Sequence, residues 1–197
     1  MNPTRQSSIE RKTRETDIQL QLNLDGIGMW QGSTGVPFMD HMLNHLAVHA
    51  LFDLRIACSG DTVIDDHHTV EDMGIVLGMT LKQAVGDKRG LERYGSQFVP
   101  MDEALVLVVL DFSGRGLLAY DLDLPGERVG TFETSLVREF LQALAANAGL
   151  TLHVKLLYGN NSHHIIEAVF KALGRALSQA VRIDARRLGV PSTKGEL

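Results

Sequence analysis

The chain has 197 residues, of which 44% are hydrophobic and 22% charged, a composition typical of a globular protein that excludes wholesale disorder. Its net charge of −5 argues against a nucleic-acid or membrane-surface partner. The longest apolar run, at 104–110, is too short to span a bilayer, and the opening segment MNPTRQSSIERKTRE lacks the apolar core of a secretory signal. A single cysteine, Cys58, excludes an internal disulfide and a thiolate metal cage, so we expect a cytoplasmic protein.

The first half of the chain predicts two strands and two helices. The alternation in IQLQLNL (18–24) indicates a half-exposed strand, and LRIAC (54–58) indicates another. Pro37 suits the first turn of a helix running to about Leu51, because the N–H that proline lacks is not needed there. A second, well-buried helix is expected from Glu71 onward.

The second half repeats this order of elements. It predicts strands at 104–110 and 151–157, a turn at 112–116, helices at 134–147 and 164–181, and an irregular tail, LGVPSTKGEL.

An internal duplication explains the repeated order. A shift of 96 residues lays segment 66–85 over 162–181, and nine of the twenty columns are then identical. Upstream, MDHMLNHLAVHA lies over VREFLQALAANA, and ETDIQLQLNLDG resembles EALVLVVLDFSG. We therefore predict one domain, 1–197, built from repeats at about 8–95 and 96–185 plus the C-terminal tail.

The best-preserved part of the repeat is a pair of histidines followed by a glutamate, in DDHHTVED and NSHHIIEA. Neighbouring residues point in different directions, so His67 and His68 cannot comfortably bind the same ion, whereas Glu71 lies within one helical turn of both. Each unit thus offers ligands in two directions, and two symmetry-related units predict two metal sites. Imidazole and carboxylate ligands favour Mn, Fe, Co, Ni or Zn, and an open site suits octahedral Mn²⁺.

Further histidines stand at a spacing of four after Pro37. His41 aligns with Glu139 in the repeat, and both residue types coordinate metals, so both are predicted ligands. His45 aligns with Ala143 and is set aside, and His153 is interpreted as structural.

Basic and hydroxyl side chains near turns predict an anion site. Hydroxyls, backbone N–H groups and cations together suit a phosphate. The candidates are Arg93, Arg115, Ser192, Thr193 and Lys194. Lys171 lies one turn beyond Glu167 on the predicted helix and is placed to approach a metal-bound ligand. We therefore expect a substrate with a metal-binding end and an anionic end.

Five sequence blocks carry a family resemblance: PFMDHMLNHLAVHALFDL, DDHHTVED, LDFSGR, NSHHIIEA and PSTKG. With these blocks the chain resembles the imidazoleglycerol-phosphate dehydratase family of histidine biosynthesis, from about Ser8 to Gly195. The resemblance implies an α+β fold with an internal duplication of two half-domains. Each half would be a mixed four-stranded sheet with two helices on one face, and the halves would pack helix to helix. It also implies a homo-oligomer of 24 subunits, with active sites between subunits.

The resemblance implies a manganese-dependent hydro-lyase with two Mn²⁺ per subunit. The reaction would convert D-erythro-imidazole glycerol phosphate to imidazole acetol phosphate. The hydrogen to be removed has no adjacent carbonyl and is not acidic. Metal-bound imidazolate would therefore help to expel hydroxide and give a diazafulvene-like intermediate.

Residue roles also follow from the resemblance. The first metal would take His41, His68, Glu71 and His163, and the second His67, His164, Glu167 and Glu139. The pattern at position 139 is histidine in some members, whereas this chain has glutamate. Catalytic roles would fall on Glu15, His68, Glu71 and Glu167. Substrate contacts would come from Glu15, His49, Arg93, Arg115, Lys171, Ser192, Thr193 and Lys194.

Two other functions use the same features. A di-metal hydrolase also activates water with paired ions, but it needs a bridging carboxylate and ions about 4 Å apart. A metal-buffering or metal-sensing protein needs no anion site, so its arginines and lysines at the turns would be replaceable without consequence.

Overall fold

The computed structural model describes residues 5–195, so the first four and last two residues of the predicted domain lie outside the described part. The first half contains β1 (Gln6–Lys12), β2 (Thr16–Asn23), β3 (Trp30–Ser33), α1 (Pro37–Ala50), β4 (Asp53–Gly60) and α2 (His67–Val85). The second contains β5 (Tyr94–Met101), β6 (Ala104–Asp111), β7 (Leu117–Asp121), β8 (Arg128–Val129), β9 (Phe132–Glu133), α3 (Leu136–Ala148), β10 (Thr151–Tyr158) and α4 (Ser162–Ala180).

Two four-stranded sheets have the same topology. Their strand orders are β1-β2-β4-β3 and β5-β6-β10-β7, and β8 pairs with β9 in a separate small hairpin. In each four-stranded sheet the β3–β4 or β7–β10 pair is parallel and the other pairs are antiparallel. The predicted α+β fold with two duplicated, mixed four-stranded halves is therefore confirmed.

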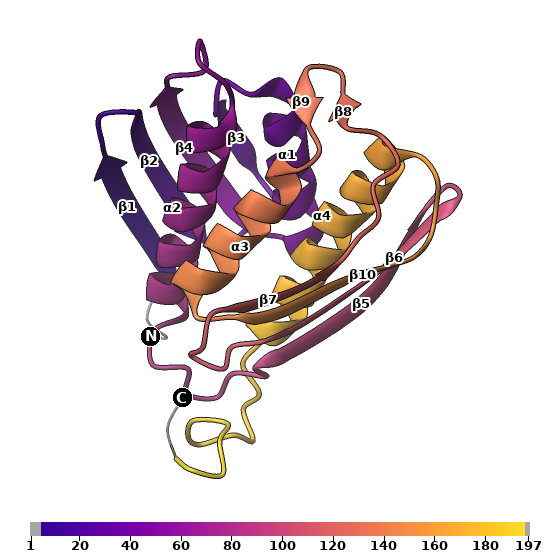
Figure 1. Ribbon diagram of the computed structural model, residues 1–197. Coiled ribbons are helices and arrows are strands. Elements are labelled where there is room, and N and C mark those ends of the chain that lie inside the picture. The colour runs from indigo at the N-terminus through magenta and orange to yellow at the C-terminus, as the bar shows by residue number, and fades with distance from the viewer. Residues whose placement is uncertain (1–4, 196–197) are drawn as a thin grey trace.

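The helices lie between the two sheets, as Figure 1 shows. α1 and α2 pack on the first sheet, α3 and α4 on the second, and the halves meet through the α1–α4 and α2–α3 pairs. Strand β6 alternates between buried and partly buried positions, so one face of its sheet enters the apolar core. No helix among the described residues is long and apolar enough to cross a membrane.

Glycines at equivalent positions allow the helices of each pair to approach closely. A Cβ at Gly174 of α4 would lie 2.7 Å from the carbonyl oxygen of Leu46 in α1. A Cβ at Gly78 of α2 would lie 2.8 Å from the carbonyl oxygen of Leu144 in α3. Because backbone atoms cannot rotate away, only glycine fits at these two crossings.

The helix predicted from Glu71 begins four residues earlier, at His67, so that prediction was wrong at its start. The Asp65 carboxylate accepts the His67 backbone N–H at 2.8 Å, which satisfies one of the free donors of the first turn. In α4, the side chain of Asn161 caps the backbone N–H groups of His163 and His164 in the same way. Both histidine pairs therefore lie in the first turn of a helix.

Candidate metal centre and anion pocket

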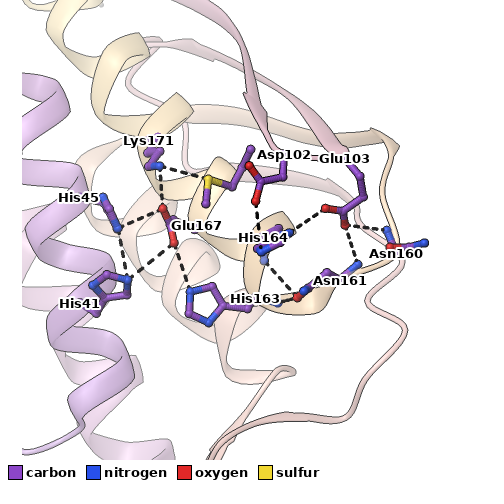
Figure 2. Close-up of polar contacts among 11 residues, drawn as sticks. His41, His45, Asp102, Glu103, Asn160, Asn161, His163, His164, Glu167 and Lys171 are labelled. Atoms are coloured by element: carbon purple, nitrogen blue, oxygen red, sulfur yellow. Dashed lines mark hydrogen bonds and ion pairs between the residues drawn. The ribbon is translucent and has the colours of Figure 1, made fainter.

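Glu167 is the centre of a polar cluster between α1 and α4, drawn in Figure 2. Its two carboxylate oxygens lie 3.3 Å from His45 Nε2 and 3.7 Å from His41 Nε2. His163 Nε2 lies 3.2 Å from the same carboxylate, and Lys171 Nζ lies 2.6 Å from it. Parallel packing of α1 and α4 brings these side chains together, because each helix presents its residues at intervals of about one turn.

The electrostatics of this cluster keep its metal-binding atoms available. The Glu167 side chain is only 8% exposed, and this burial by itself would raise its pKa. The hydrogen bond and charge of Lys171, together with His45 and His163, outweigh that effect, so the pKa of Glu167 is lowered and the carboxylate is ionised. Burial lowers the pKa of His45 to about 4, so this imidazole is neutral at physiological pH, the form that binds metals.

The donor set fits a divalent metal ion. His41, His45 and Glu167 place ligand atoms within 4.8 Å of one another, and within residues 5–195 this is the group of three donors that does so. Imidazole and carboxylate donors suit the ions from Mn²⁺ to Zn²⁺. Sequence alignment set His45 aside because its counterpart is Ala143, yet its spacing of four from His41 places both on one helix face.

The equivalent cluster in the other helix pair is more open. His67 Nε2 lies 3.5 Å from the Glu71 carboxylate. A cavity of about 540 Å³ lies beside His67. Its lining includes His67, Glu139 of α3, Glu133 and Asp66. His67, Glu71 and Glu139 therefore correspond to His163, Glu167 and His41 under the internal repeat.

The two predicted ligand sets are not assembled within one chain. Glu167, assigned to the second metal, lies with His41 and His163 of the first. Glu71, assigned to the first metal, lies with His67 of the second. The ligand sets remain predictions, and within the described residues their members come from both helix pairs.

The second histidine of each pair contacts a different carboxylate. His68 Nδ1 lies 3.0 Å from Asp61 Oδ2, and His164 Nδ1 lies 2.7 Å from Glu103 Oε2. The predicted catalytic residue Glu15 lies on the other side of its histidine, 3.7 Å from His68 Nε2. None of these partners except Glu15 was a sequence candidate.

All five predicted anion-binding residues line one cavity of about 820 Å³: Arg93, Arg115, Ser192, Thr193 and Lys194. Two hydrogen bonds to Asp111, of 2.6 and 3.0 Å, orient the guanidinium of Arg93. Its third nitrogen, Nη1, donates a hydrogen bond to the carbonyl oxygen of Pro191 at 2.8 Å and thereby connects the C-terminal tail to the domain. Arg187 also lines the cavity, and sequence reasoning missed it because it stands in an arginine-rich segment without a turn motif.

The remaining predicted substrate residue, His49, continues the histidine stripe of α1. Its ring stacks on that of His45 with centroids 6.1 Å apart. Burial, followed by the charges of Lys171 and Arg175, lowers the pKa of His49. His49 is therefore a neutral imidazole one turn beyond the cluster around Glu167.

The fold and the site define a class of protein: two duplicated α+β halves with imidazole–carboxylate clusters between paired helices and a separate cationic cavity. A family model described as imidazoleglycerol-phosphate dehydratase matches residues 34–177. The chain belongs to the imidazoleglycerol-phosphate dehydratase family, which confirms the resemblance stated from its sequence blocks.

Named relatives and solved structures agree with this assignment. The imidazoleglycerol-phosphate dehydratase of Moorella thermoacetica is 59% identical over 194 residues, covering 98% of this chain and 99% of the relative. That of Acetivibrio thermocellus is 61% identical over 193 residues, with 98% and 99% covered. The crystal structure of the Staphylococcus aureus protein has a TM-score of 0.83 at 40% identity and covers 91% of this chain and 99% of that one.

Proposed function

We propose that this chain dehydrates D-erythro-imidazole glycerol phosphate to imidazole acetol phosphate in histidine biosynthesis. Family membership supports the reaction class. The observation that carries the proposal is the pairing of an imidazole–carboxylate cluster around Glu167 with a separate cavity lined by Arg93, Arg115 and Lys194. A substrate with an imidazole at one end and a phosphate at the other needs both kinds of site.

Two Mn²⁺ ions per subunit are part of the proposal. One ion would be bound by His41, His68, Glu71 and His163, and the other by His67, His164, Glu167 and Glu139. When bound, these ions would stabilise the substrate imidazole as its anion and so favour loss of hydroxide through a diazafulvene-like intermediate.

The chain's own residues bind and orient the substrate. Arg93, held by Asp111, and Lys194 would bind the phosphate with charge-assisted hydrogen bonds. Glu15, whose carboxylate is 53% exposed and lies 3.7 Å from His68 Nε2, or a glutamate of the metal sites would move the proton. Lys171 would stabilise the charged carboxylate of Glu167 through their 2.6 Å ion pair.

We further propose that the protein works in the cytoplasm as a homo-oligomer of 24 subunits, with active sites between subunits. The separation of the predicted ligand sets in one chain supports shared sites, since Glu71 and His41 lie in different clusters. A second copy of the chain could supply the missing members of each set.

The proposed activity depends on metal, and chelation tests it. Chelator-stripped protein should form no imidazole acetol phosphate from imidazole glycerol phosphate, and added Mn²⁺ should restore turnover, followed by the acetol phosphate produced. Turnover that survives complete metal removal would contradict the proposal. A metal-loaded, assembled sample that leaves the substrate unchanged would instead favour the hydrolase interpretation.

Replacement of Lys194 by alanine should weaken substrate binding and spare the metals. A charge-assisted hydrogen bond contributes about 1.5–3 kcal/mol, so KM should rise roughly 10- to 100-fold. Manganese content, measured by elemental analysis, should not change, because Lys194 lines the anion cavity and not the Glu167 cluster. Lys155→Ala, which removes an exposed partner of Asp121, is the matched control. A Lys194 variant with wild-type KM would favour the metal-buffering interpretation.

A further inference from the structure

The second histidine of each pair is held through the same ring atom. His68 Nδ1 lies 3.0 Å from an Asp61 oxygen, and His164 Nδ1 lies 2.7 Å from a Glu103 oxygen. The other ring nitrogen, Nε2, has only a loose contact: 3.7 Å to Glu15 for His68 and 3.7 Å to Asp102 for His164. A separation of 3.7 Å is too long for a hydrogen bond, so the close partner is at Nδ1 in both halves.

The two supporting carboxylates come from different parts of the repeat. Asp61 directly follows β4, whereas Glu103 lies in the turn between β5 and β6. The residue that aligns with Glu103 in the first half is Glu15, which stands on the Nε2 side of His68 instead. The halves thus reach the same contact with different residues, so the contact is not a simple remnant of the duplication.

The side chain of Glu103 contacts the residues at the start of α4, as Figure 2 shows. One of its oxygens accepts the backbone N–H groups of Asn160 and Asn161, at 3.3 and 3.0 Å, and the other contacts His164. Asn161 in turn caps the helix by accepting the backbone N–H of His164 at 3.4 Å. The backbone and the ring of His164 are therefore fixed by one connected set of hydrogen bonds.

An ionised carboxylate accepts hydrogen bonds and donates none. A carboxylate at Nδ1 therefore selects the tautomer with its proton on Nδ1 and leaves the lone pair on Nε2. Glu103 accepts two backbone N–H groups through its other oxygen, an arrangement that favours the ionised carboxylate.

We propose that Asp61 and Glu103 are positioning residues that hold His68 and His164 in the Nδ1–H tautomer and present each Nε2 to a metal ion. This inference rests on the proposed metal-dependent function and adds two residues to it. Carboxylates behind metal-binding histidines orient the ring and raise its basicity, and their loss typically costs 10- to 100-fold in metal affinity.

The test is Mn²⁺ titration of chelator-stripped Glu103→Gln and Asp61→Asn proteins without substrate. Each amide keeps the shape and an acceptor oxygen but loses the charge. We expect each variant to weaken one of the two bound ions by at least roughly 10-fold and to leave the other near its wild-type affinity. The matched controls are Glu10→Gln on β1 and Asp121→Asn on β7, which replace exposed carboxylates and should bind both ions normally.

A purely structural role makes a different prediction. The glutamine oxygen would still accept the N–H groups of Asn160 and Asn161, so metal affinity would stay within about twofold of wild type, which overturns the proposal. Thermal unfolding of the metal-free variants shows whether weaker binding reflects a folding defect. Wild-type protein that binds no Mn²⁺ also overturns the proposal.

The binding test is independent of turnover. Wild-type protein that binds two ions but does not dehydrate imidazole glycerol phosphate would refute the proposed function and leave the positioning role intact. An active wild type whose Asp61 and Glu103 variants bind metal normally would refute the positioning role alone.

Discussion

Replacing Glu167 with alanine is expected to remove one of the two metal ions and to abolish turnover. Four side chains converge on this carboxylate: His41, His45, His163 and Lys171. Without it, the ammonium of Lys171 has no counter-charge in the cluster and would repel a divalent cation. Both the lost ligand and the added repulsion lower the affinity for metal.

The expected loss of metal affinity is larger than that for a carboxylate that only hydrogen-bonds a metal-binding histidine. Removing such a supporting carboxylate costs about 10- to 100-fold in metal affinity, so removing a ligand itself should cost at least roughly 100-fold. Glu167→Gln should be nearly as defective, because a neutral amide neither compensates Lys171 nor binds Mn²⁺ as a carboxylate does.

Metal content and turnover are measured on the same dialysed samples. The variant should retain the other ion, whose predicted ligands do not include Glu167, so manganese should fall toward one ion per subunit, while acetol phosphate formation falls below detection. Glu10→Gln, which replaces an exposed glutamate on β1, should keep full metal content and turnover. Normal stoichiometry in Glu167→Ala would show that Glu167 is not a ligand.

The fold was largely predictable because the repeat and the periodicity are local features. The alternation at 18–24 and the continuous apolar run at 104–110 predicted the inner strands β2 and β6, and the 96-residue shift relates α2 to α4. The edge strand Gln6–Lys12 was not predicted, since its polar residues show little apolar alternation and its pairing partner β2 defines it. The β8–β9 hairpin is only two residues long on each side and leaves no periodic signal.

The candidate site also has features that the sequence predicted and features that depend on tertiary packing. The two HHxxE units and the cations of the tail were predicted, because their residue types and spacing carry chemical information. The contacts of His45 with Glu167 and of Glu103 with His164 depend on how distant segments pack, which no local pattern encodes. Alignment of the two halves even argued against His45, since its counterpart is alanine.

Replacing Gly174 with valine is expected to damage the fold and the metal site together. A Cβ at this position would lie 2.7 Å from the Leu46 carbonyl oxygen and 3.2 Å from the Ala50 backbone nitrogen. Neither backbone atom can move without shifting α1. Glycine to a larger residue in a helix gains some intrinsic helix propensity, up to about 1 kcal/mol. Overpacking at a fixed backbone outweighs that gain and should lower the free energy of unfolding by roughly 2–3 kcal/mol.

The effect on the site follows from which helices cross at Gly174. α1 carries His41 and His45, and α4 carries His163 and Glu167, so separating the helices lengthens the distances that define the cluster. Gly78→Val provides a matched comparison at the α2–α3 crossing, where a Cβ would lie 2.8 Å from the Leu144 carbonyl oxygen. It should destabilise the fold similarly and weaken the ion near His67 and Glu139.

Urea unfolding of metal-free protein measures the stability change, and Mn²⁺ titration measures the change at each site. Gly189→Val is the steric control, because a Cβ there meets nothing within 4 Å. If Gly174→Val were as stable as the wild type, the close crossing of α1 and α4 would not require glycine at this position. If it were destabilised but bound both ions normally, helix spacing would not set the ligand geometry. The expected joint loss would instead tie metal binding to the same glycine-mediated packing that joins the two halves.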